Sequence, residues 1–128
     1  MSAIVFLQIF TLMFVANAVV YAGAFFINGA LLPETLSFIY DKTSYIARVV
    51  ICLISFLTVG NILFAKAFDW FNPVWVAPLN IAAFIFVQII IAILVNRAWP
   101  SVMIIPAVSL ILIGAYWVHT LLNVPPSS

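Results

Sequence analysis

The chain has 128 residues, of which 68% are hydrophobic and only 5% are charged, and its formal net charge at pH 7 is +1. Soluble domains are about half apolar, so this composition excludes a soluble fold and predicts an integral membrane protein. The four basic and three acidic residues fall in three clusters that mark the expected loops: Glu34, Asp41, Lys42 and Arg48; Lys66 and Asp69; and Arg97.

Four apolar stretches are long enough to cross a bilayer as helices, since a hydrocarbon core about 30 Å thick needs about 20 helical residues. Barrel strands would alternate apolar and polar residues, whereas these stretches are apolar all round. The predicted fold is therefore an all-α integral membrane protein. We expect one domain over residues 1–128 with four transmembrane helices, at about 4–31, 45–68, 73–95 and 100–123.

The first expected helix is uncharged, and we expect it to be retained rather than cleaved as a signal peptide, because no basic residue precedes Lys42. It nevertheless carries a polar stripe. At about 100° per residue, Asn17, Tyr21 and Asn28 lie within about 40° of one another on the helix surface. Such a stripe must face protein or a cavity, and hydrogen bonding between helices is the simpler interpretation.

The first loop and the second expected helix carry the next polar residues. Prolines restrict the backbone, so Pro33 predicts a turn that leads into an interfacial segment before Ser44. Arg48 and Lys66 lie near the ends of the second helix, where long side chains can reach the headgroups. Within this helix we take Asn61 as a candidate for lining a cavity.

The third and fourth expected helices contain prolines. Pro78 lies inside the third helix, where it frees the carbonyl of Val74, so Pro78 and nearby Asn80 are candidates for a hinge or a cavity lining. Pro100 suits the first turn of the fourth helix, and Pro106 would free a carbonyl there.

Small residues predict two places where helices approach closely. One is the face formed by Ala18 and Ala22, with Gly23 beside them, and the other is Gly114 with Ala115.

Most enzyme chemistry is missing from the sequence. Cys52 is the only cysteine and His119 the only histidine, which excludes a dithiol pair, a bis-histidine haem and a multi-histidine metal site. No phosphate-binding loop or catalytic triad is present, so we expect no enzymatic activity and no cofactor. The three acids lie in loops, which disfavours proton antiport through a carboxylate inside the membrane: Glu34, Asp41 and Asp69.

The distribution of basic residues gives an expected orientation. Lys42, Arg48 and Arg97 share one side of the membrane, whereas Lys66 and the terminal amine lie on the other. The positive-inside rule then places both termini outside.

Two segments resemble the small multidrug resistance branch of the drug/metabolite transporter superfamily. Residues 72–80, Asn-Pro-Val-Trp-Val-Ala-Pro-Leu-Asn, look like that family's entry to its third helix, and residues 95–100, Val-Asn-Arg-Ala-Trp-Pro, look like its basic loop before the fourth. The resemblance runs from Arg48 to about Val118 and implies a four-helix bundle of the small multidrug resistance type. The Pro78-Leu79-Asn80 segment is nearer the branch that forms flippase subunits.

The resemblance also bears on the mechanism. Drug exporters of the family carry a glutamate in the first helix, and Asn17 occupies the best-matching position here. This departure removes the proton-coupling group. Flippase-like members lack that acid too, so the departure disfavours drug/proton antiport more than it disfavours the family.

These features predict a non-enzymatic transporter or flippase subunit that moves an amphiphilic or lipid-linked substrate as a dimer or heterodimer. The alternative is a structural or accessory subunit of a larger membrane complex. We expect contact with the lipid bilayer and another membrane protein, no nucleic-acid partner, and a bacterial inner membrane location. The candidate cavity residues are Asn17, Tyr21, Asn28, Asn61, Pro78 and Asn80.

Overall fold

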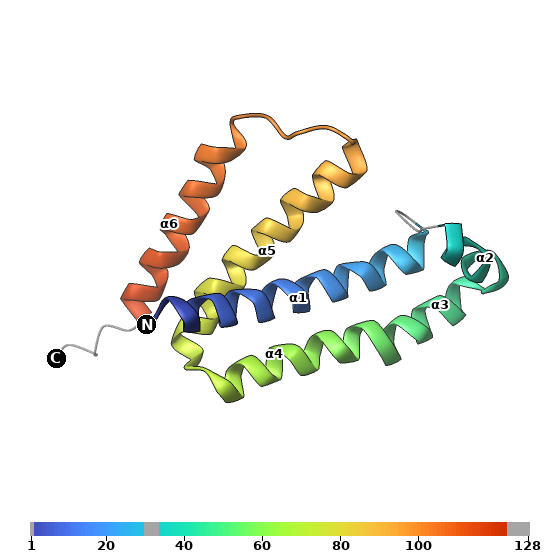
Figure 1. The fold of residues 1–128 in the computed structure, drawn as a ribbon, viewed down its shortest axis with the longest axis horizontal. Helices are drawn as coiled ribbons and strands as arrows, with labels where there is room; N and C mark the ends of the chain where they lie inside the picture. The colour runs from blue at the N-terminus through green and yellow to red at the C-terminus, as the bar shows by residue number, and fades with distance from the viewer. Residues whose placement is uncertain (1, 30–33, 123–128) are drawn as a thin grey trace.

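The computed structural model describes residues 2–29 and 34–122, and helices are the only regular secondary structure in those ranges (Figure 1). Four helical segments are long and apolar enough to cross a membrane, which confirms the prediction of an all-helical fold with four candidate spans. In chain order the elements are α1 (Ala3–Asn28), α2 (Glu34–Lys42), α3 (Tyr45–Cys52), the π-helical turn η1 (Leu53–Leu57), α4 (Thr58–Trp70), α5 (Pro73–Asn96) and α6 (Ile104–Leu122).

The helix ends differ from the expected ones where local capping decides them. Helix α1 ends at Asn28 because Gly29 adopts φ 79°, a left-handed conformation that closes the helix through a hydrogen bond to the Phe25 carbonyl. Residues 30 and 31, expected in the first helix, lie outside the described residues, as does 123 at the end of the fourth. The turn expected at Pro33 also lies outside the described residues, and the segment expected to follow it is the nine-residue helix α2.

Helix α6 begins four residues after Pro100. The preceding residues form turns, in which the Ser101 carbonyl accepts a hydrogen bond from the Ile104 amide and the Ser101 hydroxyl from the Met103 amide. Pro106 is therefore the third residue of α6, where a missing N–H costs little. The Val102 carbonyl, expected to be left free by Pro106, accepts a hydrogen bond from the Ile105 amide instead.

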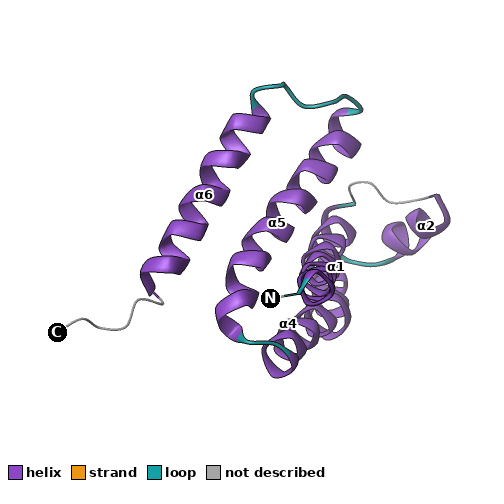
Figure 2. Ribbon diagram, turned by 60° about the vertical axis from the view of Figure 1, so that its left-hand side comes forward, coloured by secondary structure: helices purple, strands orange, loops and turns teal. Residues whose placement is uncertain are grey.

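Helix α1 is the central element. It packs between α4 and α5, while α6 packs against α5 (Figures 1 and 2). The interior of the bundle is a cluster of apolar side chains from α1, α4 and α5: Ile9, Met13, Ala67, Val76, Leu79 and Ala83. By contrast, none of the membrane-spanning window of α6 is buried inside the chain. Three spans thus form a packed unit, and the fourth extends from one side of it.

The second span, Tyr45–Trp70, is continuous but contains the π-helical turn η1 against α1. The Thr58 hydroxyl donates to the Leu53 carbonyl at 2.8 Å, and this i→i−5 pairing follows the wider π-type turn. Opposite this turn, a Cβ placed on Gly23 would lie 2.7 Å from both Cys52 Sγ and Phe56 Cβ. Glycine is therefore what allows α1 and the second span to approach so closely.

Arg48 is buried rather than extended toward the headgroups, with only 9% of its surface exposed. Its Nε donates to the Ile27 carbonyl at 3.0 Å, and one terminal nitrogen donates to the carbonyls of Tyr40 at 3.1 Å and Thr43 at 2.7 Å. The guanidinium also stacks on the Tyr40 ring at 3.9 Å. Because these carbonyls lie near the ends of α1 and α2, where helix dipoles favour a cation, Arg48 ties three segments together.

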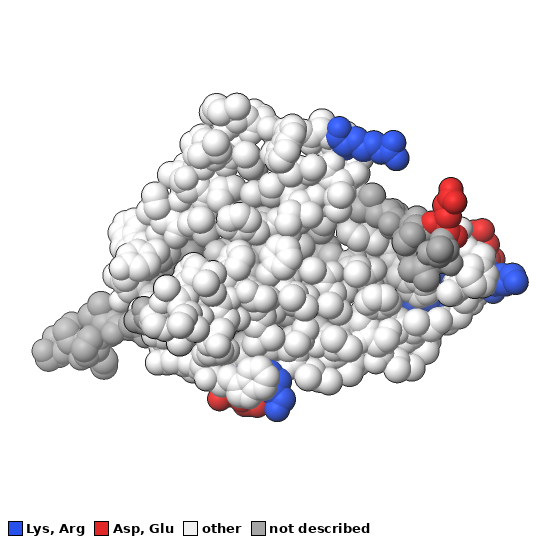
Figure 3. Space-filling model, viewed as in Figure 1, with Lys and Arg blue, Asp and Glu red and all other residues white. Residues whose placement is uncertain are grey.

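Charged side chains gather at the two ends of the bundle (Figure 3). On the face shown, coloured atoms mark α2 and the loop after α5 at one end and the last turn of α4 at the other, with uncharged surface between them. The N-terminus of α1, the α4–α5 corner and the C-terminus of α6 lie at the same end (Figure 1). This distribution fits a bundle whose middle lies in hydrocarbon.

Candidate functional site

Two of the predicted polar residues meet in the interior of the bundle. Asn17, which is 8% exposed, donates through Nδ2 to the Met13 carbonyl at 2.8 Å and to Asn80 Oδ1 at 2.9 Å. The first bond lies within α1, and the second joins α1 to α5. An unpaired carboxamide in hydrocarbon is costly, so this pair fixes which faces of the two helices meet.

A second polar contact lies further along the same helix pair. The Gln88 carboxamide donates to the Tyr21 hydroxyl, and the Tyr21 ring packs against Phe84 with 6.1 Å between ring centroids. We call the four side chains Asn17, Tyr21, Asn80 and Gln88 the polar seam. The predicted site does not include Gln88. Its polar side chain, in the same apolar span as Asn80, was the signal that could have identified it.

The remaining predicted residues lie outside the polar seam. Asn28 is exposed at the end of α1, and its backbone carbonyl accepts a long hydrogen bond of 3.5 Å from the Tyr40 hydroxyl. Asn61 is exposed on α4. Pro78 is half-buried in α5, two residues before Asn80. The structure therefore brings Asn17, Tyr21 and Asn80 together but not the whole predicted set.

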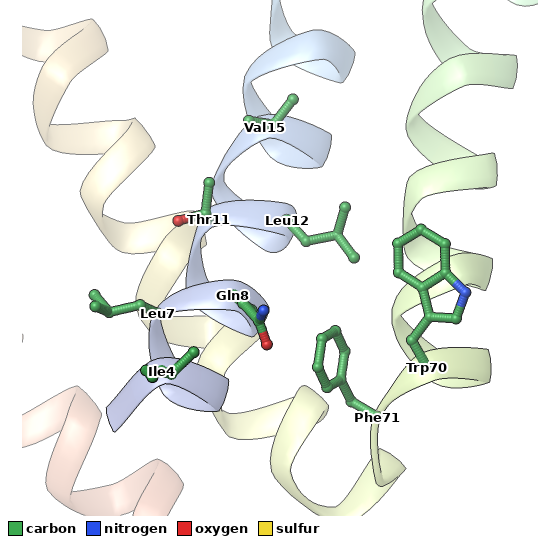
Figure 4. A pocket seen from close by; sticks show the side chains of 8 residues that line it. All are labelled: Ile4, Leu7, Gln8, Thr11, Leu12, Val15, Trp70 and Phe71. Atoms are coloured by element: carbon green, nitrogen blue, oxygen red, sulfur yellow. The ribbon is translucent and has the colours of Figure 1, made fainter. Parts of the chain in front are cut away.

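An apolar groove lies on another face of α1 (Figure 4). It has a volume of about 540 Å³, within the usual range of ligand pockets. Gln8 and Asn17 are nine residues apart, which places them about 180° apart on the helix, so the groove and the polar seam occupy opposite faces. The lining residues come from the first half of α1 and the end of the second span: Ile4, Leu7, Gln8, Thr11, Leu12, Val15, Trp70 and Phe71.

Most of the groove lining is apolar, and its two polar side chains are Gln8 and Thr11. Gln8 lies between Ile4 and Leu12 along α1 and faces Phe71 (Figure 4). Lys66 Nζ lies 5.9 Å from the centroid of the Trp70 ring, so a positive charge lies beside the groove.

A second groove, of about 530 Å³, lies between the N-terminal part of α5 and the C-terminal part of α6. The rings of Trp75 and His119 pack there with 5.3 Å between centroids. Within the part of the chain that the structure describes, no group of three or more His, Cys, Asp and Glu side chains could hold a metal ion. His119 is thus part of an aromatic contact at the bundle end.

We expect the Asn17–Asn80 contact to stabilise the bundle measurably. In a double-mutant cycle of Asn17→Leu and Asn80→Leu, the coupling energy should be about 0.6–1.7 kcal/mol, the range found for hydrogen bonds between membrane helices. Unfolding of the reconstituted protein in mixed micelles would measure it. A matched cycle of Asn17→Leu with Asn61→Leu should show no coupling, since those side chains do not touch, and equal coupling in both cycles would contradict this assignment.

Comparison of the chain with protein-family models, curated proteins and solved structures gives no match. The resemblance to the small multidrug resistance branch rests on the sequence alone, at residues 72–80 and 95–100. The structure shows a polar seam between α1 and α5 and a mostly apolar groove on the opposite face of α1.

Proposed function

We propose that this protein is a non-enzymatic transporter or flippase subunit of the drug/metabolite transporter type, working as a dimer or heterodimer. It moves an amphiphilic or lipid-linked substrate across a bacterial inner membrane, with both termini outside. The observation that carries the proposal is the groove on α1, which is mostly apolar, has Gln8 in its lining and has Lys66 beside its Trp70. Such a groove can take an acyl or prenyl chain while the headgroup stays at the membrane surface.

The charge beside the groove favours an anionic headgroup. At about 100° per residue, Lys66 lies about 40° from Trp70 around the α4 axis, whereas Asp69 lies about 100° from Trp70 in the same direction, beyond Lys66. The ammonium is therefore the nearer charge. Gln8 makes no hydrogen bond to any other residue within 2–29 and 34–122, so its carboxamide is available to an ester or phosphate oxygen.

The polar seam supports the same proposal because it connects the groove to a helix that can bend. The Asn17–Asn80 hydrogen bond couples α1, which forms most of the groove wall, to α5. In α5, Pro78 has no amide to donate to the Val74 carbonyl, which makes this turn easier to deform than the rest of the helix. Bending there would shift α1 and open or close the groove.

Lipid movement in proteoliposomes tests the proposal. The probe is phosphatidylglycerol with a fluorescent acyl chain, and dithionite quenching reports how fast it crosses the bilayer. We expect Thr11→Phe, which fills the groove, to lower the protein-dependent rate about tenfold, equivalent to about 1.4 kcal/mol of barrier. Val118→Phe, on the exposed side of α6, is the matched control and should leave the rate unchanged.

Two results would contradict the transport proposal. One is movement no faster than in protein-free vesicles, for anionic and zwitterionic probes alike. The other is equal loss of rate in Thr11→Phe and Val118→Phe, because a general packing defect would then explain both.

A second candidate, an accessory subunit of a larger membrane complex, is favoured by one observation. No residue in the spanning window of α6 is fully buried inside the chain, so most of the surface of this helix is available to another protein. Purification in mild detergent separates the candidates. A stoichiometric larger assembly, together with no lipid movement, would favour the accessory function, whereas an isolated dimer that moves lipid would favour the transporter.

A further inference from the structure

Asn61 has a polar side chain at a depth in the membrane where an unpaired carboxamide is costly, so it needs a hydrogen-bond partner. It is exposed on α4, and its carboxamide makes no hydrogen bond to another residue in the described parts of the chain. It lies nine residues before Trp70, which at about 1.5 Å per residue is about 13–14 Å along the helix. With the aromatic corner at the membrane surface, Asn61 lies near the middle of a core about 30 Å thick.

The neighbouring residue confirms this depth. Gly60 packs against α1 near the middle of that helix, where an added Cβ would lie 2.6 Å from Val20 Cγ2 and 3.5 Å from the Ala16 carbonyl oxygen. The side of α4 that faces α1 is therefore fixed. Asn61, about 100° further round the helix, is turned away from that contact and toward the lipid.

On the side of Asn61 that is away from α1, the side chains one turn before and after it suit close contact with another helix. Thr58 and Ala65 lie about 60° and 40° from it on the same face, and both are small and exposed. The Thr58 hydroxyl is already bonded to the Leu53 carbonyl, so it adds no unsatisfied group. A helix can therefore approach the Asn61 backbone closely, as small residues allow in membranes.

We propose that α4 pairs with α4 of a second copy of this chain across a two-fold axis that passes near Asn61. A carboxamide has both a donor and an acceptor, so two identical asparagines facing each other can form two reciprocal hydrogen bonds. A hydrophobic partner would leave the group unpaired, and lipid chains offer it no partner at all. The inference rests on the oligomer in the proposed function and assigns its contact surface.

Cysteine cross-linking in proteoliposomes tests this surface with Asn61 intact. In a Cys52→Ala background, Ala65→Cys places a thiol on the proposed face, and Val59→Cys places one about 160° from Asn61 at similar depth. Val59 is 47% exposed and therefore equally open to collision. We expect disulfide-linked dimers from Ala65→Cys and few from Val59→Cys, because the bond requires Cα atoms within about 7 Å.

Removing the carboxamide should weaken the pair. Asn61→Leu is expected to raise the dimer dissociation constant about 3- to 20-fold, measured by fluorescence energy transfer as the protein is diluted with lipid. It should also lower cross-linking through Ala65→Cys, while Asn61→Gln should retain part of both signals. A Val59→Leu variant provides the control and should leave the dissociation constant unchanged.

Several results would overturn this interface. They are a monomer at all lipid dilutions, equal cross-linking from both cysteine positions, or a dimer that is unaffected by Asn61→Leu. If lipid movement persists in any of these cases, the interface is wrong and the transport proposal stands. If the dimer forms as expected but moves no lipid, the transport proposal fails while the interface is supported.

Discussion

Replacing Arg48 by methionine is expected to lower the free energy of unfolding by about 3 kcal/mol. The buried guanidinium donates to carbonyls of Ile27, Tyr40 and Thr43, and methionine fills similar space without any donor. The loss combines the missing charge-assisted hydrogen bonds with the desolvated carbonyls left behind. Detergent-titrated unfolding, followed by circular dichroism, would measure it.

The controls for Arg48 distinguish its hydrogen bonds from its charge. Lys42→Met removes a positive charge from the same end of the bundle, but Lys42 is exposed, and the expected loss is below about 0.5 kcal/mol. Arg48→Lys keeps the positive charge but loses the planar guanidinium and its fixed set of N–H donors. It should therefore recover only part of the stability. Equal losses for Arg48→Met and Lys42→Met would show that the carbonyl contacts contribute nothing.

The Gly23→Ala variant should also be strongly destabilised, by about 2 kcal/mol. Its new methyl group would lie 2.7 Å from Cys52 Sγ and from Phe56 Cβ, so α1 and the second span must separate. The matched control is Gly114→Ala in α6, where a Cβ meets nothing within 4 Å in this chain and no loss is expected. The same unfolding measurement applies to both variants.

A second-site change tests the cause of the Gly23 effect. Cys52→Ala removes the sulfur from the collision, so the pair Gly23→Ala and Cys52→Ala should be less destabilised than the sum of the two single variants. Strict additivity would mean that the collision with the Cys52 sulfur contributes nothing and that the collision with Phe56 Cβ accounts for the loss.

The number of spans could be predicted because it depends only on length and hydropathy. The arrangement of those spans could not, since α1 and α5 are apolar almost all round and give little indication of which face is inward. The small residues illustrate this point. Ala22 is exposed, whereas the close approach occurs at Gly23 and at Gly60 of α4. Helical spacing places Gly23 only beside the predicted face and gives no signal for Gly60, because the sequence does not show which helices are neighbours.

The contacts of the polar residues could be predicted only in part, again because the sequence does not show which helices are neighbours. The shared face of Asn17 and Tyr21 follows from helical spacing, but their partners Asn80 and Gln88 depend on α1 and α5 being adjacent. Arg48 was expected to reach the headgroups because it lies near a helix end. The carbonyls that accept its hydrogen bonds are those of Ile27 in α1, Tyr40 in α2 and Thr43 just after α2. The burial of Arg48 therefore depends on how these segments pack together.

The double hydrogen bond of Asn17 has a consequence for the synthesis of the protein. Asn80 is 63 residues further along the chain, so at about 5–20 residues per second it follows Asn17 out of the ribosome after about 3–13 s. During that interval α1 lies in the membrane before α5 has been synthesised. The Met13 carbonyl, one turn away in the same helix, accepts one amide hydrogen of Asn17 from the start. The helix therefore supplies one hydrogen-bond partner for Asn17 by itself and gains the second, Asn80, only when α5 has been translated.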